Sequence, residues 1–144
     1  MANLTFNSFF ELREFLNYRI QQSLQNEVAQ EIVAVMRRNI QKYVYNAYTP
    51  THYKRTYKLL DRGSIQVQMV SRGLLKVRNY RRDESGVKDV AKIIETGSGY
   101  TWKGDLDSRI GARPFHQKTM TELINNKNHV RAFRRGLRIP TYMS

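Results

Sequence analysis

The sequence predicts a single α+β domain with a long N-terminal helix, a small antiparallel β-sheet and a C-terminal helix. Three observations lead to this fold class. Apolar residues recur every three or four positions up to residue 46, two later segments alternate apolar and polar residues, and a proline precedes a second helical pattern. A chain of 144 residues, 40% of them hydrophobic, is long enough to bury one such core.

The N-terminal helix is predicted to begin at Phe9. Ser8 and Glu11 have the spacing of a capping box, in which each side chain accepts a hydrogen bond from a free amide at the helix start. Apolar residues then follow at helical spacing: Leu12, Leu16, Ile20, Leu24, Val28, Ile32, Met36 and Ile40. A helix that reached Asn46 would be about 57 Å long at 1.5 Å per residue. We therefore expect the helix to break near Gln25–Asn26 or to be covered by neighbouring copies.

A β-hairpin is predicted after a connector. The helix must end before Pro50, because the residue ahead of a proline is disfavoured in helical backbone, and residues 49–62 then form the connector. Residues 64–70 (SIQVQMV) alternate apolar and polar side chains, which is typical of a half-buried strand. Residues 74–80 predict the antiparallel partner strand, joined to the first by a turn at Arg72–Gly73.

The remaining elements are a short strand, a loop, a helix and a tail. Val90–Glu95 (VAKIIE) predicts a third short strand. A loop over residues 96–112 contains four of the eight glycines, and a loop of this length is usually either functional or mobile until something binds it. Pro114 suits the first position of a helix with an apolar face formed by Phe115, Thr119, Leu123 and Ile124. The α+β domain is thus expected to cover residues 1–126, and residues 127–144 to form a basic C-terminal tail.

The composition argues against several classes of protein. There is no cysteine, so neither disulfides nor thiolate metal sites can hold the fold. No stretch approaches the roughly 18 consecutive apolar residues that a membrane span needs. The N-terminus reaches acidic residues too early for a secretory signal. We therefore expect a soluble protein that is made in the cytoplasm and has no membrane partner.

The residues that usually carry catalysis are scattered. His52, His116 and His129 lie in separate segments and lack the spacing of metal ligands. The close acidic pairs, Asp83–Glu84 and Asp105 with Asp107, lie in hydrophilic segments where carboxylates are usually solvated. We therefore predict no catalytic, cofactor-binding or metal site, and a protein that is not an enzyme.

The positive charge is large and unevenly distributed. Lysine and arginine total 25 against 12 acidic residues, a formal net charge of +13. Twelve basic residues and one acidic residue lie between Arg37 and Arg82, and residues 127–138 add five basic residues without an acid. The first 36 residues instead carry a net charge of −2. This asymmetry indicates a polyanionic partner, and charge alone does not distinguish a phosphate backbone from an acidic protein surface.

The connector is rich in tyrosine. The stretch YNAYTPTHYKRTYKLL, residues 45–60, alternates four tyrosines with Lys54, Arg55 and Lys58. Such rings and cations can stack on nucleic acid bases, or they can form a surface that another subunit covers. The residues themselves leave both interpretations open.

Three spaced signatures resemble those of the phage head–tail connector family, also called tail-completion or neck proteins. After a long helix, a proline-containing stretch leads through a threonine and a leucine to the start of a strand, matched here by Pro50, Arg55–Thr56, Leu59 and Ser64–Ile65. A Glu-x-Gly element follows, matched by Ile94–Gly97, and an Arg-Pro-Phe opens the last helix, matched by Arg113–Phe115. The likeness covers residues 9–125. This chain departs from the family pattern at Tyr57, where a glycine is common, and in the longer interval between Leu59 and Ser64.

The resemblance implies a viral structural protein of the virion neck. Such a protein forms a sixfold or twelvefold ring between portal or adaptor proteins and tail terminator or tail tube proteins. It completes the tail, connects head and tail, and lets genomic DNA pass at ejection without sequence-specific contact. No cofactor is implied.

Two sets of residues are predicted to serve this assembly. The assembly interface is expected at Tyr48, Pro50, Tyr53, Arg55, Tyr57, Trp102, Arg113 and Phe115. Contacts with DNA in the lumen or with an acidic partner are expected at Arg37, Arg38, Lys42, Lys54, Lys58, Arg81 and Arg82. Tyrosine and arginine are enriched at interface hot spots. The tyrosines can equally pin the connector onto its own domain, because buried aromatic rings serve either purpose.

The alternative function is a stand-alone basic module that binds nucleic acid through these cations and Arg55. The sequence contains no recognition helix, zinc finger or RNA-recognition signature, which disfavours this alternative. A small nuclease is weaker still, because the chain lacks clustered acids and a suitably placed histidine.

Overall fold

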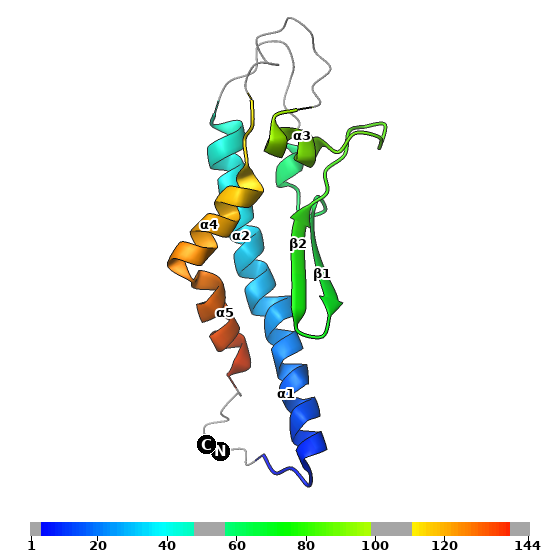
Figure 1. Ribbon diagram of the computed structural model, residues 1–144, viewed down its shortest axis with the longest axis vertical. Helices are drawn as coiled ribbons and strands as arrows, with labels where there is room; N and C mark the ends of the chain where they lie inside the picture. The colour runs from blue at the N-terminus through cyan, green and yellow to red at the C-terminus, as the bar shows by residue number, and fades with distance from the viewer. Residues whose placement is uncertain (1–3, 48–56, 99–110, 139–144) are drawn as a thin grey trace, which may run out of the picture.

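A long N-terminal helix forms the axis of the molecule (Figure 1). The computed structural model describes residues 4–47, 57–98 and 111–138. The axis consists of α1 (Phe9–Ser23), the π-helical segment η1 (Leu24–Val28), α2 (Ala29–Ile40) and a second π-helical segment η2 (Gln41–Tyr45). The helix therefore does not break at Gln25–Asn26. A wider π-helical turn occupies that position instead, and helical geometry continues through it.

The predicted start of the helix is confirmed, with a changed partner for Glu11. Ser8 Oγ accepts a hydrogen bond from the Glu11 amide at 3.2 Å. The Glu11 carboxylate accepts from the amide of Asn7 at 2.9 Å, one residue earlier than in a standard capping box. Two free amides at the start of α1 are thereby satisfied.

The predicted β-hairpin is also confirmed. Strands β1 (Ile65–Ser71) and β2 (Leu74–Asn79) pair antiparallel, with Ile65 opposite Asn79 and Met69 opposite Leu75. Gly73 adopts a φ of +79° at the turn, a backbone conformation that glycine reaches without a steric penalty. A bulge between Met69 and Ser71 shifts the register next to this turn.

The prediction of a third strand at Val90–Glu95 is wrong, because these residues form helix α3 (Val90–Thr96). Asp89 caps its start by accepting a hydrogen bond from the Lys92 amide at 3.0 Å. Gly97, with a φ of +69°, ends it in left-handed backbone. The β-branched residues suggest a strand, but the capping residues at both ends favour a single short helix.

The C-terminal part of the described chain contains two helices. The helix predicted after Pro114 is α4 (Phe115–Asn126), which packs against α2. Lys127 turns the chain with a φ of +56°, and α5 (Asn128–Leu137) then lies against α1 and η1 (Figure 1). The stretch predicted to be a basic tail thus contains a packed helix. The small and apolar residues of α5 face the long helix, and Ala132 is buried there. The prediction of a tail gives weight to the arginines and not to these residues.

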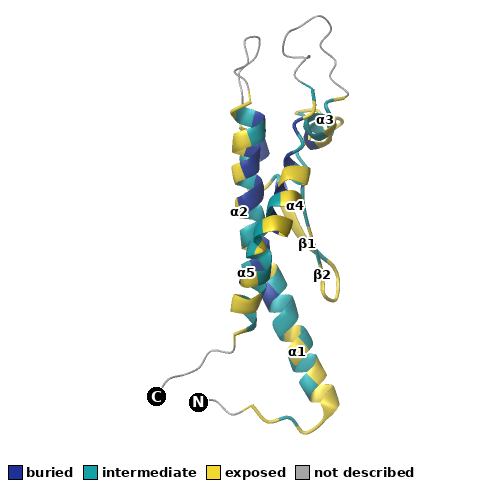
Figure 2. Ribbon diagram, turned by 60° about the vertical axis from the view of Figure 1, so that its left-hand side comes forward, coloured by how far each residue is buried: buried dark blue, intermediate teal, exposed yellow. Residues whose placement is uncertain are grey.

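The hydrophobic core lies at one end of the long helix. Its buried residues come from six helices and strands: Met36, Ile40, Val44, Leu59, Ile65, Ala91 and Phe115. Leu59 belongs to the short 3₁₀ helix η3 (Lys58–Leu60). Figure 2 shows that burial is concentrated on α2 and its neighbours, whereas the N-terminal part of α1 extends beyond them and carries only exposed and half-buried residues. None of the helices in the described ranges is long and apolar enough to cross a lipid bilayer.

Candidate functional site

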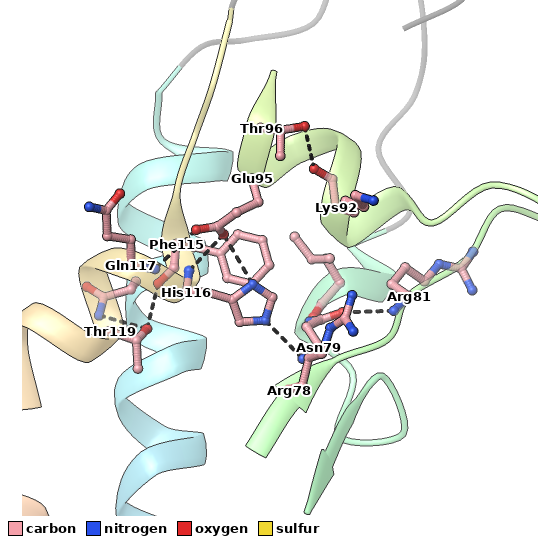
Figure 3. Close-up of polar contacts among 12 residues, drawn as sticks. Arg78, Asn79, Arg81, Lys92, Glu95, Thr96, Phe115, His116, Gln117 and Thr119 are labelled. Carbon is pink, nitrogen blue, oxygen red and sulfur yellow. Dashed lines mark hydrogen bonds and ion pairs between the residues drawn. The ribbon is translucent and has the colours of Figure 1, made fainter. Parts of the chain in front are cut away.

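A network of hydrogen bonds joins α3, α4 and β2 where two of the signature motifs meet (Figure 3). The Glu95 carboxylate accepts from the backbone amide of His116 at 2.9 Å and from that of Gln117 at 3.1 Å. These are free amides at the start of α4, so the carboxylate caps that helix from another element. We call Glu95, His116, Gln117 and Asn79 the polar junction.

Both ring nitrogens of His116 are engaged in the polar junction. Nδ1 lies 3.2 Å from Glu95 Oε2, and Nε2 accepts a hydrogen bond from the Asn79 amide at 3.1 Å (Figure 3). This pattern places the proton of the neutral ring on Nδ1. The side chain of Asn79 is itself buried, donating to the Leu59 carbonyl at 2.7 Å and accepting from the Arg81 amide at 3.0 Å.

The polar junction has a structural rather than a catalytic arrangement. The His116 ring has no nitrogen left over to take a proton from a substrate or to bind a metal. Burial raises the pKa of Glu95. Hydrogen bonds from the His116 ring and from the amides of His116 and Gln117 lower this pKa by more than burial raises it, so the net shift is downward. Among the described residues, no group of three or more histidine and acidic side chains is placed to hold a metal ion.

The polar junction holds the two ends of the glycine-rich segment side by side. The Arg113 amide donates to the Ile94 carbonyl at 2.8 Å. Gly97 lies so close to Ala112 that a Cβ atom on Gly97 would be 2.8 Å from Ala112 Cα. The Glu-x-Gly and Arg-Pro-Phe signatures, separated in the sequence, are therefore direct neighbours in the fold.

The residues predicted for an assembly interface have different environments. Arg113 is 7% exposed and Phe115 is 0% exposed, so both lie within the interior of the protomer. Tyr57 is 50% exposed, and its ring centroid lies 4.8 Å from that of Tyr45. The other predicted interface residues lie outside the described ranges: Tyr48, Pro50, Tyr53, Arg55 and Trp102.

The backbone of Tyr57 has a conformation that suits the glycine common at this position in the head–tail connector proteins that the sequence resembles. Its φ is +57°, in the left-handed region that favours glycine. The resemblance places a common glycine at this position. The tilted contact with Tyr45 offsets part of the backbone strain, because aromatic pairs in such geometry attract one another.

Two of the three predicted basic contacts on the long helix are bound to neighbouring elements. Arg37 donates to the Leu60 carbonyl at 3.0 Å. Arg38 pairs with Glu122 on α4, and Lys42 lies over the ring of Tyr43 with its Nζ 5.1 Å from the centroid. Arg37 and Arg38 thus contact different elements, although they are adjacent in the sequence, and Lys42 contacts its neighbour within η2.

Two of the other predicted basic contacts share one acid. Lys58 and Arg81 both pair with Glu84 Oε1, at 2.9 Å and 3.0 Å, and these bonds lower the pKa of Glu84. Arg82 donates to the Val87 carbonyl at 3.3 Å. Lys54 lies outside the described ranges. The described cations of the predicted set therefore have several different partners.

Two surfaces were not predicted from the sequence. One is apolar and lies on the projecting part of α1, where Phe9 is 90% exposed and Phe10 is 62% exposed. The other is the exposed face of α5, which carries Arg131, Arg134, Arg135 and Arg138. These arginines are spaced three and four positions apart, which indicates a helix. The prediction of a basic tail at residues 127–144 overlooks this spacing.

Comparison with known proteins gives the chain a family. The YomN family matches residues 8–139. The SPbeta prophage-derived uncharacterized protein YomN of Bacillus subtilis (strain 168) is 34% identical over 99 residues, which is 68% of either chain. No solved structure gives a significant match. The chain therefore belongs to the YomN family, a phage-derived family of proteins.

Proposed function

We propose that this protein is a structural component of the neck of a tailed bacteriophage and not an enzyme. It forms a ring that joins the portal side of the head to the tail and lets DNA pass. The phage-derived family and the likeness to head–tail connector proteins support this role. The observation that carries the proposal is the uncovered apolar surface on the projecting part of α1.

The α1 apolar surface consists of Phe9, Phe10, Leu12, Leu16 and Ile20. These side chains line a shallow groove together with Arg13 and Asn17. Burial of a large apolar side chain contributes about 1.5–3 kcal/mol, so leaving several exposed is unfavourable for a lone protomer. We infer that another copy of the chain covers them.

A groove between α2 and β1 is the surface that we assign to the neighbouring copy. Its floor is formed by small and apolar residues: Ala29, Val33, Ala34, Ile65 and Val67. Gln25, Gln30, Arg37 and Arg62 line it as well. Contact between the two surfaces would cover apolar side chains of both copies.

The proposed contact accounts for a ring. It joins two different surfaces, so it is heterologous, and repeated heterologous contacts close into rings when the rotation between copies permits. A two-fold dimer would instead use the same surface on both copies. Portal or adaptor proteins on one side and tail terminator or tail tube proteins on the other are the proposed neighbours of this ring.

Light scattering and electron microscopy of the purified protein test the proposal. We expect closed rings with a mass that is a multiple of the 17.0 kDa protomer. The double substitution Phe9→Ser and Leu16→Ser should reduce the mass toward the protomer without lowering the melting temperature. Tyr18→Ser is the matched control, because Tyr18 is an exposed aromatic residue on the opposite face of α1. A wild-type protein that stays monomeric at high concentration, alone and with phage neck proteins, would contradict the proposal.

A further inference from the structure

The exposed side of α5 carries a regular row of arginines. Arg131, Arg134 and Arg135 of α5 and Arg138, the residue that follows its last turn, are three, one and three positions apart and are all exposed, and we call them the α5 arginine face. Residues at these spacings lie on one side of a helix. The row extends for about 10 Å along the helix axis at 1.5 Å per residue.

The opposite side of α5 is fixed to the long helix. Ser23 Oγ donates to the Phe133 carbonyl at 2.7 Å, and Ala132 is fully buried. Gly136 lies so close to η1 and α1 that a Cβ atom there would be 2.8 Å from the Cα of Ser23. Arg19 donates to the carbonyls of Gly136 and Arg138 and so satisfies the last turn of α5. These contacts fix the orientation of α5, so that its arginine face points toward solvent.

The α5 arginine face has little negative charge to neutralise it. Residues 127–138 contain five basic residues and no acid. Within the described part of the chain, the side chains of Arg134 and Arg138 have no hydrogen bond or ion pair. Arg135 lies 3.9 Å from Glu27, and Arg131 binds the Asn126 carbonyl. Two of the four guanidinium groups are therefore free to bind an anion.

The chemistry of this face fits a phosphate backbone. None of the large exposed hydrophobic residues of the described chain lies on α5, whereas protein interfaces have an apolar or aromatic centre surrounded by charges. Insertion into a lipid surface needs a free apolar face, and that of α5 is already covered by the long helix. Guanidinium groups bind phosphate oxygens through paired N–H donors, without any apolar contribution.

We propose that the α5 arginine face binds the phosphate backbone of double-stranded DNA without sequence preference. A duplex presents one charge per roughly 1.7 Å of its axis, so a row about 10 Å long meets phosphates in any register. This inference deepens the proposed function and rests on it, because the neck is where a ring protein meets the genome. It adds a surface that the predicted set of DNA contacts did not include.

Fluorescence anisotropy with a random-sequence duplex of about 24 base pairs, titrated over a series of KCl concentrations, tests the inference. Each neutralised phosphate contributes roughly 0.9 to the slope of log affinity against log salt. The double substitution Arg134→Gln and Arg138→Gln should therefore reduce that slope by about 2 and weaken binding at low salt. Arg134→Lys with Arg138→Lys should retain the slope, because it keeps the charges.

The control removes the same charge elsewhere. Lys76→Gln with Lys92→Gln affects two exposed lysines on β2 and α3 and should leave the slope unchanged. An unchanged slope in the α5 glutamine variant, or an equal reduction in the control, would overturn the inference, and the first result would point to an acidic protein as the partner of α5.

Light scattering on the same samples separates this inference from the proposed function. Rings that do not bind the duplex overturn the inference and leave the neck role intact. Duplex binding that depends on α5 in a protein that never assembles supports the inference and overturns the neck role.

Discussion

Gly97 and Ala112 are in backbone contact. A Cβ atom on Gly97 would lie 2.8 Å from the Cα of Ala112, closer than non-bonded carbon atoms approach, and the φ of Gly97 is +69°. This contact closes the base of the glycine-rich segment beside the polar junction. It also brings the two signature motifs together without any side chain from Gly97.

Gly97→Ala should destabilise the protein through two effects. Left-handed backbone costs a residue with a side chain about 1–2 kcal/mol, and the overlap with Ala112 adds about 1–3 kcal/mol. The control is Gly73→Ala, because Gly73 has a φ of +79° but a Cβ atom there would meet nothing within 4 Å. Urea denaturation should show a loss for Gly97→Ala that clearly exceeds the loss for Gly73→Ala. Equal losses of unfolding free energy would mean that the backbone near Ala112 moves away at little energetic cost.

Glu95→Gln should change how stability depends on pH. The pKa of Glu95 is lowered in the folded protein from the ordinary value of 4.5. A carboxylate with a lowered pKa stabilises the fold above its unfolded-state pKa, and this contribution is lost as the pH falls through the folded-state pKa. Below about pH 4.5 the wild type should therefore lose part of its free energy of unfolding. The variant lacks this carboxylate and should not show that loss.

Urea denaturation of both proteins between about pH 3 and pH 7 measures this difference. Asp83, Glu84 and Glu122 also have lowered pKa values, but they contribute to both proteins and cancel in the comparison. At neutral pH the variant should be less stable by about 1 kcal/mol, because an amide caps the start of α4 less well than a carboxylate. Parallel curves over the whole range would contradict the role of Glu95.

Lys127→Gly should stabilise the protein by about 0.5–1 kcal/mol. Lys127 has a φ of +56° at the turn between α4 and α5, and its amide donates to the Leu123 carbonyl at 2.8 Å. Glycine relieves the backbone strain and keeps this bond. Lys127→Ala, which loses the same side chain but keeps a Cβ atom, should give no such gain. The comparison of their melting temperatures isolates the backbone effect.

Gly136→Ala should destabilise the protein, although the same change in an exposed helix stabilises it by roughly 1 kcal/mol. The new methyl group would lie 2.7 Å from Ser23 Cβ and 2.8 Å from Ser23 Cα, so α5 must move away from the long helix. A loss of about 1–3 kcal/mol in chemical denaturation is expected. Hydrogen exchange should become faster in α5 and stay unchanged in β1 and β2. A gain in stability would show that the two helices are not tightly packed.

The sequence predicts most of the fold and less of the surface. Periodicity and the cap at Ser8 are local signals, so the start of the long helix and the hairpin follow from them. The strand prediction for Val90–Glu95 is wrong because it weighs the β-branched residues above the capping signals of Asp89 and Gly97. The packing of α5 depends on the fit between Ser23 and Gly136, which are far apart in the chain and leave no pattern within a short window.

The polar junction could be predicted only in part. The resemblance singles out Glu95 and Arg113–Phe115, but no spacing rule places a carboxylate of one helix on the first amides of another. His116 is an isolated histidine in the sequence, since its partners Glu95 and Asn79 lie 21 and 37 residues away. Such long-range polar contacts are set by tertiary packing rather than by local preference.

The closing of the segment between Gly97 and Ala112 at its base has a consequence for the divergence of the family. Two of the contacts between described residues that fasten it, Arg113 to Ile94 and Glu95 to α4, lie at its ends and engage backbone atoms. These contacts hold the two ends in place whatever the length and sequence of the residues between them, so that length and sequence can vary among relatives. Members of the family can thus differ in this part of the sequence while they inherit the same frame.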